Sequence, residues 1–195
     1  MSKPPQPSSI GSSLLEGVQA MDAGAWQRLV ELYAPVIYGW CRQSAVQPHD
    51  AADVVQEVFR AVLTGVGQFR RDRPGESFRG WLWTITRNKI RDHARRRQRR
   101  PAAAGGSDAA EQLQQLPEPP PPAPTSRESD GLVHRALTLI RAEFEEPTWR
   151  AFWQATVDGR PAAEIARELG MSKGAVRQAK YRVLRRLREE LAGLG

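Results

Sequence analysis

The sequence is poor in the residues and segments that several protein classes require. Its 195 residues include one cysteine, Cys41, which excludes an internal disulfide framework and a cysteine-based zinc site. No segment approaches the ~18 consecutive apolar residues of a membrane span, and the N-terminus lacks the apolar core of a secretory signal. The sequence therefore predicts a cytoplasmic protein without stable membrane insertion.

Catalytic and metal-binding patterns are missing as well. The three histidines, His49, His93 and His134, lie far apart in the sequence and show no metal-ligand spacing. The chain has neither a glycine-rich phosphate loop nor an arrangement typical of a catalytic nucleophile. We therefore expect no enzyme activity, no cofactor and no metal.

Aromatic residues are absent between Trp83 and Phe144, and residues 101–131 within this interval hold seven prolines. Such a segment cannot bury enough apolar surface to offset the entropy lost on ordering. It is predicted to be a flexible linker between two small domains. The expected division is a disordered tail (residues 1–13), a first domain (14–100), the linker (101–131) and a second domain (132–195).

The net charge of +7 is distributed unevenly. Residues 70–100 hold 12 basic and 3 acidic side chains, and residues 160–190 hold 9 and 4. Residues 101–159, between these blocks, hold 4 basic and 9 acidic side chains. Solvated helix faces usually mix the two signs, so the two arginine-rich blocks indicate binding to a polyanion.

Apolar periodicity predicts helices in both domains and no sheet, so the expected fold class is all-α. In the first domain a helix is predicted around Trp26–Cys41, and Pro35 is expected to kink or divide it. A second helix is expected from Asp50, as its N-cap, to about Val66. A third, long helix is expected from near Ser77 into the arginine block. The second-domain helices are expected at about Leu132–Phe144, Pro147–Asp158, Pro161–Leu169 and Ser172–Leu191.

The clearest motif lies at residues 162–181, where two short helices are joined by Gly170-Met171-Ser172. Ala166 supplies the small residue needed where two helices cross, and Val176 supplies the branched apolar residue that packs the second helix on the first. Glycine relieves the left-handed strain of the turn, and Ser172 caps the second helix. The spacing predicts a helix-turn-helix, with a plain cationic hairpin as the alternative reading. Its outward residues suit a major groove, and the arginines that follow suit phosphates.

A second basic surface is predicted on the long helix of the first domain. Trp83 lies off the apolar stripe of Phe78, Leu82 and Ile85. An exposed tryptophan beside arginines could stack on an unpaired base, worth ~1–3 kcal/mol. The alternative is that Trp83 packs on the preceding helix, and composition does not choose between the two.

Acidic residues gather at the start of the second predicted helix. Asp50, Asp53 and Glu57 share one face. Three readings fit them: a metal site, dipole compensation in the first helical turn, or a protein-docking face. Too few ligands are present to favour the metal.

Taken together, these segments resemble the extracytoplasmic-function (ECF) group of bacterial RNA polymerase sigma factors. The segment from Asp50 to Phe59 resembles the polymerase-docking segment of that family, and the segment from Phe78 to Asn88 resembles its promoter-melting helix. The helix-turn-helix resembles its reader of the minus-thirty-five element. The order of the three motifs around a linker is more specific than any one of them.

The resemblance implies a role for each group of residues. It implies a non-catalytic subunit that binds core RNA polymerase and promoter DNA, with an anti-sigma factor as a further partner. The polymerase-docking residues would be Asp50, Asp53, Gln56, Glu57 and Phe59. The minus-ten residues would be Phe69, Trp83, Arg87, Asn88, Arg91, Arg95 and Arg96, with the loop 67–77 helping to hold a flipped base. The minus-thirty-five residues would be Ser172, Lys173, Gly174, Arg177, Gln178, Tyr181, Arg182 and Arg185.

Two rival functions remain on the sequence alone. An autonomous helix-turn-helix regulator would bind duplex DNA without being a polymerase subunit, and it would not need the second basic helix at Trp83–Arg100. An enzyme acting on nucleic acid would need a carboxylate cluster, for which Asp50, Asp53 and Glu57 are the only candidates.

Overall fold

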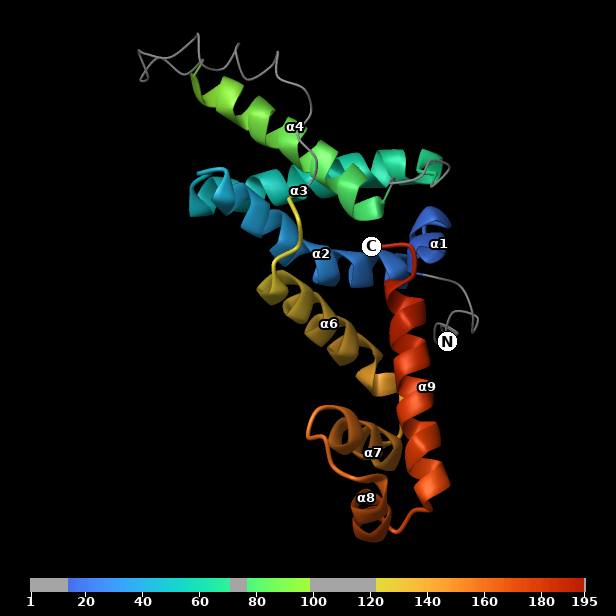
Figure 1. The fold of residues 1–195 in the computed structure, drawn as a ribbon. Coiled ribbons are helices and arrows are strands. Elements are labelled where there is room, and N and C mark those ends of the chain that lie inside the picture. Colours follow the sequence, from blue (N-terminus) through green and yellow to red (C-terminus); the bar gives the residue numbers. More distant parts are fainter. Residues whose placement is uncertain (1–13, 71–76, 99–121, 195) are drawn as a thin grey trace, which may run out of the picture.

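The computed structural model describes residues 14–70, 77–98 and 122–194. These residues form helices and no strand (Figure 1), in agreement with the expected all-α class. The helices of the first domain are α1 (Leu14–Gln19), α2 (Ala23–Gln43), α3 (Pro48–Gly65) and α4 (Phe78–Gln98), with a short 3-10 turn, η1 (Val66–Gln68). Those of the second are α6 (Ser126–Ile140), η2 (Arg141–Glu143), α7 (Glu146–Thr156), α8 (Ala162–Leu169) and α9 (Lys173–Leu191).

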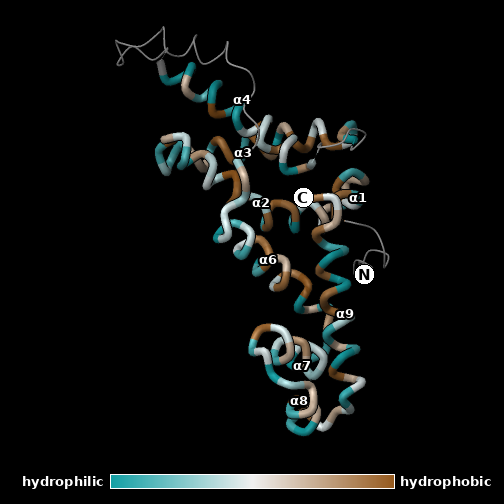
Figure 2. The backbone as a smooth tube through the Cα atoms, viewed as in Figure 1, coloured by the Kyte–Doolittle hydropathy of each residue, from teal (hydrophilic) through white to brown (hydrophobic). Residues whose placement is uncertain are grey.

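The core of the first domain lies between α2, α3 and α4. Its largest fully buried side chains are Tyr33, Trp40, Phe78 and Leu82. Aromatic edges meet ring faces at Tyr33–Phe78 and Trp40–Trp83, with centroids 5.4 and 5.3 Å apart. The polar end of α4 projects beyond this core (Figures 1 and 2), which leaves its last basic turn open to a partner.

The second domain contains the predicted helix-turn-helix. Ile165, Ala166, Val176 and Ala179 form one buried cluster between α8 and α9. Gly170 has φ +64°, the left-handed conformation that the turn requires. The hydroxyl of Ser172 accepts a hydrogen bond from the Ala175 amide at 3.0 Å, so Ser172 is the expected cap. The motif forms as the spacing predicted.

Two expectations about helix boundaries are wrong, and of the two outcomes expected at Pro35 the division of the helix does not occur. Helix α2 continues through Pro35, because Leu32, Val36 and Ile37 bury the same face on both sides of the proline. Asp50 is not the cap of α3, because Pro48 already occupies the first turn and Gln47 precedes it. Helix α6 begins at Ser126, inside the expected linker, where the Thr125 hydroxyl accepts a hydrogen bond from the Glu128 amide.

The two domains lie against each other. Helix α6 and the end of α9 contact α2 (Figure 1), and Ala136 and Leu194 belong to the same buried cluster as the first-domain core. The proline-rich segment 101–121 lies outside the described residues. Helix α1 was not expected; its Leu14, Leu15 and Val18 belong to the same cluster, and α1 lies beside the end of α9 (Figure 1).

Candidate functional site

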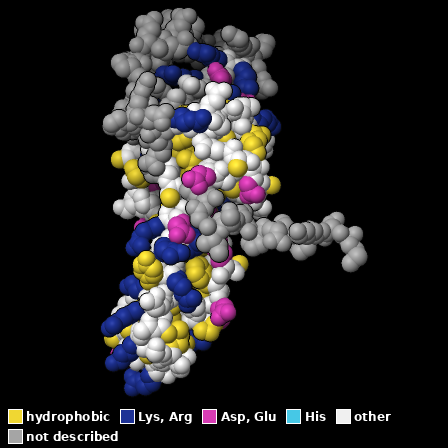
Figure 3. Space-filling view, turned by 90° about the vertical axis from the view of Figure 1, so that its right-hand side faces the viewer, with side chains coloured by type: hydrophobic (Ala, Val, Ile, Leu, Met, Phe, Trp, Pro, Cys, Tyr) yellow, Lys and Arg dark blue, Asp and Glu magenta, His cyan; other side chains and the backbone are white. Residues whose placement is uncertain are grey.

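The outward face of α9 collects the residues expected to contact duplex DNA. With 3.6 residues per turn, Lys173, Arg177 and Tyr181 follow one another at four-residue steps along an exposed side of α9, away from the buried Val176 and Val183. Tyr181 is 57% exposed. Figure 3 shows Lys and Arg side chains gathered over the part of the molecule where α9 lies. The remaining members of this face are Gly174, Gln178, Arg182 and Arg185, all exposed, with Ser172 at its start.

Local contacts fix the orientation of this face. Glu168 on α8 accepts hydrogen bonds from Gln154 and Arg160, at 2.9 and 2.6 Å, which fastens α8 to α7 and to the preceding loop. These two hydrogen bonds lower the pKa of Glu168. Arg182 donates a hydrogen bond to the Thr148 hydroxyl at 3.3 Å, which ties α9 to α7. Helices α8 and α9 are therefore held by polar and charged contacts as well as by their apolar core.

The basic surface of α4 is less uniform than the sequence suggested. Asn88 and Arg95 are exposed and, with Arg91, lie on the side opposite to Leu82 and Thr86. Arg87 flanks this group. Arg96 faces α3 instead and donates a hydrogen bond to Glu57 at 2.9 Å.

The aromatic residues expected to meet DNA are engaged inside the protein. Trp83 packs against Trp40 of α2, and its indole nitrogen is buried without a hydrogen-bond partner among the described residues. Its contacts thus match the packing alternative. Phe69 is 8% exposed and lies against Phe78 and Trp81, with centroids 5.8 and 5.1 Å away. In this conformation Phe69 is part of the first-domain core and Trp83 is half-buried against it, so their assignment to DNA contact stays a prediction.

The acidic face of α3 divides into two groups. Asp53 and Gln56 are exposed. Asp50 and Glu57 are half-buried and face α4: Asp50 lies 3.3 Å from His93 and 3.8 Å from Arg97. The hydrogen bond from Arg96 lowers the pKa of Glu57. Phe59 is not part of this face, because its ring is buried against Trp26.

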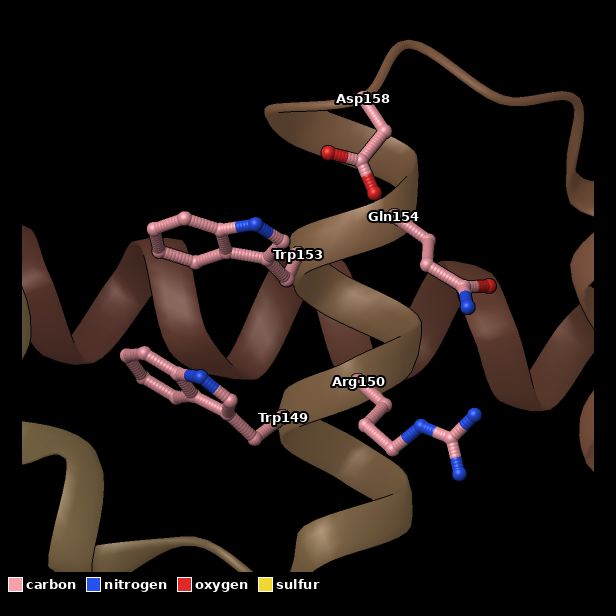
Figure 4. A pocket seen from close by; sticks show the side chains of 5 residues that line it. All are labelled: Trp149, Arg150, Trp153, Gln154 and Asp158. Carbon is pink, nitrogen blue, oxygen red and sulfur yellow. The ribbon is translucent and has the colours of Figure 1, made fainter.

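A pocket on α7 was missed by the sequence analysis. Trp149 and Trp153 extend side by side from one side of the helix, and Arg150 and Gln154 extend from the other (Figure 4). Asp158 completes the lining of this shallow pocket of about 360 Å³. Arg141 lies 5.1 Å above the Trp149 ring. Both tryptophans are half-exposed, and helical spacing alone does not show which rings of a helix remain so.

Metal and membrane sites find no support in the part of the chain that the structure describes. No group of three or more His, Cys, Asp or Glu side chains in these residues is arranged to hold a metal ion. None of the described helices is long and apolar enough to cross a membrane. Residues 71–76 of the expected base-holding loop lie outside the described residues.

Comparison with known proteins identifies both domains. Residues 29–100 match the family model of sigma-70 region 2, and residues 150–187 match that of sigma-70 region 4. The ECF RNA polymerase sigma factor BldN of Streptomyces coelicolor is 29% identical over 174 residues, which are 89% of this chain and 63% of that protein. SigE of Mycolicibacterium smegmatis is 32% identical over 168 residues, 86% of this chain and 62% of that protein. The chain thus spans a little under two thirds of the length of these two relatives.

A third relative is matched over more of its length. SigD of Mycobacterium tuberculosis, also an ECF sigma factor, is 30% identical over 180 residues, 90% of this chain and 81% of that protein. Among solved structures, a chain of the RsbN–BldN complex aligns at a TM-score of 0.37 and 22% identity, covering 89% of this chain and 96% of that chain. The sequence identity to SigD over most of both proteins places the chain in the ECF RNA polymerase sigma factor family.

Proposed function

We propose that the protein is a promoter-specificity subunit. In this proposal it binds core RNA polymerase through α3, contacts the minus-ten element through α4 and contacts the minus-thirty-five element through α9. The observation that carries the proposal is the presence, in one chain, of a helix, α3, that exposes Asp53 and Gln56, and of two separate basic helices, α4 and α9. An autonomous regulator that binds only duplex DNA would need neither the docking face of α3 nor the basic helix α4.

Helix α9 would enter the major groove with its N-terminal residues. Arg177 and Gln178 are exposed there, and these side chains suit guanine and adenine edges. Arg182 and Arg185 lie further along the helix and would contact phosphates, which position the protein without specifying sequence.

Helix α4 would contact the opened strand. The proposed contacts are Asn88, Arg91 and Arg95, which share a face, with Arg87 beside them. The rest of the proposed minus-ten set is engaged in the first domain: Arg96 pairs with Glu57, and Phe69 and Trp83 are packed. For Phe69 to touch DNA, the first domain would have to rearrange on binding, whereas the exposed Arg96 would only exchange Glu57 for a phosphate.

Helix α3 would dock on polymerase through Asp53 and Gln56, with Asp50 and Glu57 at the border with α4. An anti-sigma factor would be a further protein partner, as the resemblance implies.

The decisive experiment is the affinity of the purified protein for core RNA polymerase without DNA. We expect stoichiometric binding that weakens in a folded Asp53→Ala/Glu57→Ala double variant. The matched control is Glu145→Ala/Asp158→Ala, which removes two exposed acids from the second domain. No binding by the wild-type protein, with duplex DNA still bound, would favour the autonomous regulator instead.

A further inference from the structure

Helix α8 packs on α7 through small side chains. The buried cluster around Ala166 of α8 receives two residues from α7, Ala151 within it and Ala155 beside it, and both are alanines. Helix α9 is held differently, because its Val183 lies in a second cluster with large side chains of α6 and α7, among them Leu137, Phe152 and Trp153. Interlocking ridges of side chains fix the relative position of two packed helices, and alanine forms only shallow ridges. Apolar packing therefore fixes α9 on α7 more firmly than it fixes α8.

A closed ring of hydrogen bonds, here termed the Glu168 ring, connects the end of α8 to α7. The side-chain amide of Gln154 on α7 donates to Glu168 Oε1 at 2.9 Å, and the Arg160 guanidinium donates to Glu168 Oε2 at 2.6 Å. The backbone amide of Arg160 donates to the Gln154 carbonyl oxygen at 2.9 Å, which closes the ring. Arg150, one turn before Gln154, donates a further, longer hydrogen bond of 3.4 Å to Glu168 Oε1. Both oxygens of one carboxylate are thus bound by donors from two separate segments.

Arg160 extends this connection along the length of α8. It precedes the helix, and its guanidinium lies 4.0 Å from Glu164 and 2.6 Å from Glu168, which are one turn apart. One side chain thus contacts acidic residues from both turns of α8, while its own backbone is fixed on α7. Sliding or rotation of α8 against α7 would break at least one of these contacts.

The Glu168 ring is too exposed to contribute much to folding stability. The side chains of Glu168, Arg160 and Arg150 are 40%, 34% and 51% exposed. Ion pairs in such positions add little to the free energy of unfolding. Hydrogen bonds nevertheless require defined distances and angles, so the ring can define the position of α8 without stabilising the domain much.

The place of Glu168 in the chain connects the ring to the start of α9. Glu168 lies two residues before Gly170, whose left-handed conformation makes the turn, and four residues before Ser172, which caps α9. Because the turn is this short, a shift at the end of α8 passes to the first turn of α9. The middle of α9 is held separately by its packing on α6 and α7. The effect of the ring is thus confined to the start of α9.

We propose that Glu168 is a positioning residue for recognition of the minus-thirty-five element. It touches no DNA itself; it holds the end of α8 and, through the turn, keeps residues 172–177 in the orientation that enters a major groove. This role in recognition rests on the proposed function of α9, whereas the effect of Glu168 on the start of α9 is a property of the free chain. A shift of about 1 Å at this end would misalign side chains with base edges, because base recognition depends on hydrogen-bond geometry.

The test compares Glu168→Ala with Glu164→Ala in the full-length chain. Glu164 is exposed on the same helix, carries the same charge and lies outside the ring, with only a 4.0 Å contact to Arg160. The probes are a duplex that the wild-type protein selects from a randomised pool and a duplex of the same length with that sequence scrambled. Fluorescence anisotropy at one salt concentration gives the ratio of the two affinities, here termed the preference. We expect Glu168→Ala to lower the preference by at least about fivefold, and Glu164→Ala to leave it unchanged. Glu168→Ala should melt within about 3 °C of the wild type.

A neutral variant separates the effect of position from that of charge. Removal of an acidic residue near DNA can by itself tighten binding to every duplex. Gln154→Ala removes one donor of the ring from α7 without changing the net charge, and it should also lower the preference. The Gln154→Ala/Glu168→Ala double variant should lose no more preference than Glu168→Ala alone, because both changes break the same ring. Tighter binding to both duplexes in Glu168→Ala, with no effect of Gln154→Ala, would overturn the positioning role.

Amide hydrogen exchange of the free chain separates this proposal from the proposed function. In Glu168→Ala, exchange at residues 169–177 should increase, whereas exchange at residues 180–187 should match the wild type. If the wild type shows no preference between duplexes, the proposed role of α9 fails, while hydrogen exchange still decides whether Glu168 fixes the start of α9. Unchanged exchange in Glu168→Ala would overturn the proposal. A lowered preference together with a fall in melting temperature of more than about 10 °C would also overturn it, because the loss would then reflect general destabilisation.

Discussion

Helices α4 and α9 are both long and basic, yet their cations stand in different environments. On α9, Lys173 and Arg177 are exposed on the face opposite to the core. On α4, Arg79 and Arg96 are paired with Glu128 and Glu57, which come from other helices. Under the proposed function, the α9 surface could bind DNA as it stands, whereas the α4 surface would first exchange acidic partners for phosphates.

This difference would follow from the target that the proposed function gives each helix. A duplex presents fixed edges, so a rigid, exposed face is sufficient to recognise it. An unpaired strand forms only after the duplex has opened, and exposed cations on α4 would bind any nucleic acid beforehand. Internal pairing reduces such unspecific binding and makes the α4 surface depend on the rest of the protein.

The largest expected effect tests whether the two surfaces fold independently. Val176→Asp buries a charge between α8 and α9, at a position that is 1% exposed, and should cost at least ~3 kcal/mol of stability. We expect duplex binding to be lost while the first domain stays helical and binds single strands, measured by circular dichroism and fluorescence anisotropy. The control is Ala163→Asp, on the exposed side of α8. Joint unfolding of both domains would show that they form one cooperative unit.

The next effect tests whether α9 recognises sequence. Arg177→Ala should cost ~1–3 kcal/mol of binding to the preferred duplex and less on other sequences, as for loss of a contact with a base edge. Arg188→Ala, near the other end of the same helix, should weaken binding evenly. Competition titrations at one fixed salt concentration measure both. Equal losses on every sequence for Arg177→Ala would remove its assignment to base recognition.

A smaller effect concerns the turn that orients α9. Gly170→Ala should destabilise the protein by ~1–2 kcal/mol, because an L-residue is strained at a φ of +64°. Gly39→Ala is the matched control: this glycine lies inside α2 with no atom within 4 Å of an added Cβ, so alanine should stabilise by ~0.5–1 kcal/mol. Thermal unfolding compares the two. Changes of the same sign would contradict the role assigned to the turn.

The smallest effect concerns the pairing on α4. Glu57→Gln releases Arg96 and should strengthen single-strand binding by less than about fivefold, since the pair is largely solvated. Asp53→Asn removes the same charge from α3 at an exposed position one turn away, and should change binding less.

The same pair has a pH signature. The folded-state pKa of Glu57 lies below its ordinary value of 4.5, so its stabilising effect is present above that pH and is lost as the pH falls through the lowered pKa. Acid titration of stability should therefore be shallower in Glu57→Gln than in the wild type. Identical titration curves would show that the Arg96 contact does not persist in solution.

Sequence was sufficient where local chemistry decides the structure. Gly170, Ser172 and the pair Ala166 and Val176 act over a few residues, and the helix-turn-helix formed where they predicted. Local reasoning failed where tertiary packing compensates a local cost. Pro35 removes a helical hydrogen bond, yet α2 continues because burial on both sides outweighs that loss.

The sequence did not predict which acidic residues pair with the basic ones. A count of charges shows that Arg79 and Arg96 are present, but their pairs are 49 and 39 residues away. Trp83 was open to two readings for the same reason, since only the position of Trp40 decides which side of α4 is covered. The buried Leu194 had no signal, because it follows the end of a helix whose periodic pattern has already stopped.

Helix α9 is one continuous helix that connects the end proposed to recognise DNA with the first domain. A small rotation of the whole helix therefore displaces that end. Its 19 residues span ~28 Å, so a rotation of ~10° about the buried end would move Ser172 by ~5 Å. That displacement exceeds the ~3.4 Å rise between base pairs of one strand. Substitutions around Arg28 and Tyr33, which lie in the other domain and contact Glu190 and Leu194, would thus change the direction of the α9 axis without changing the side chains that α9 exposes.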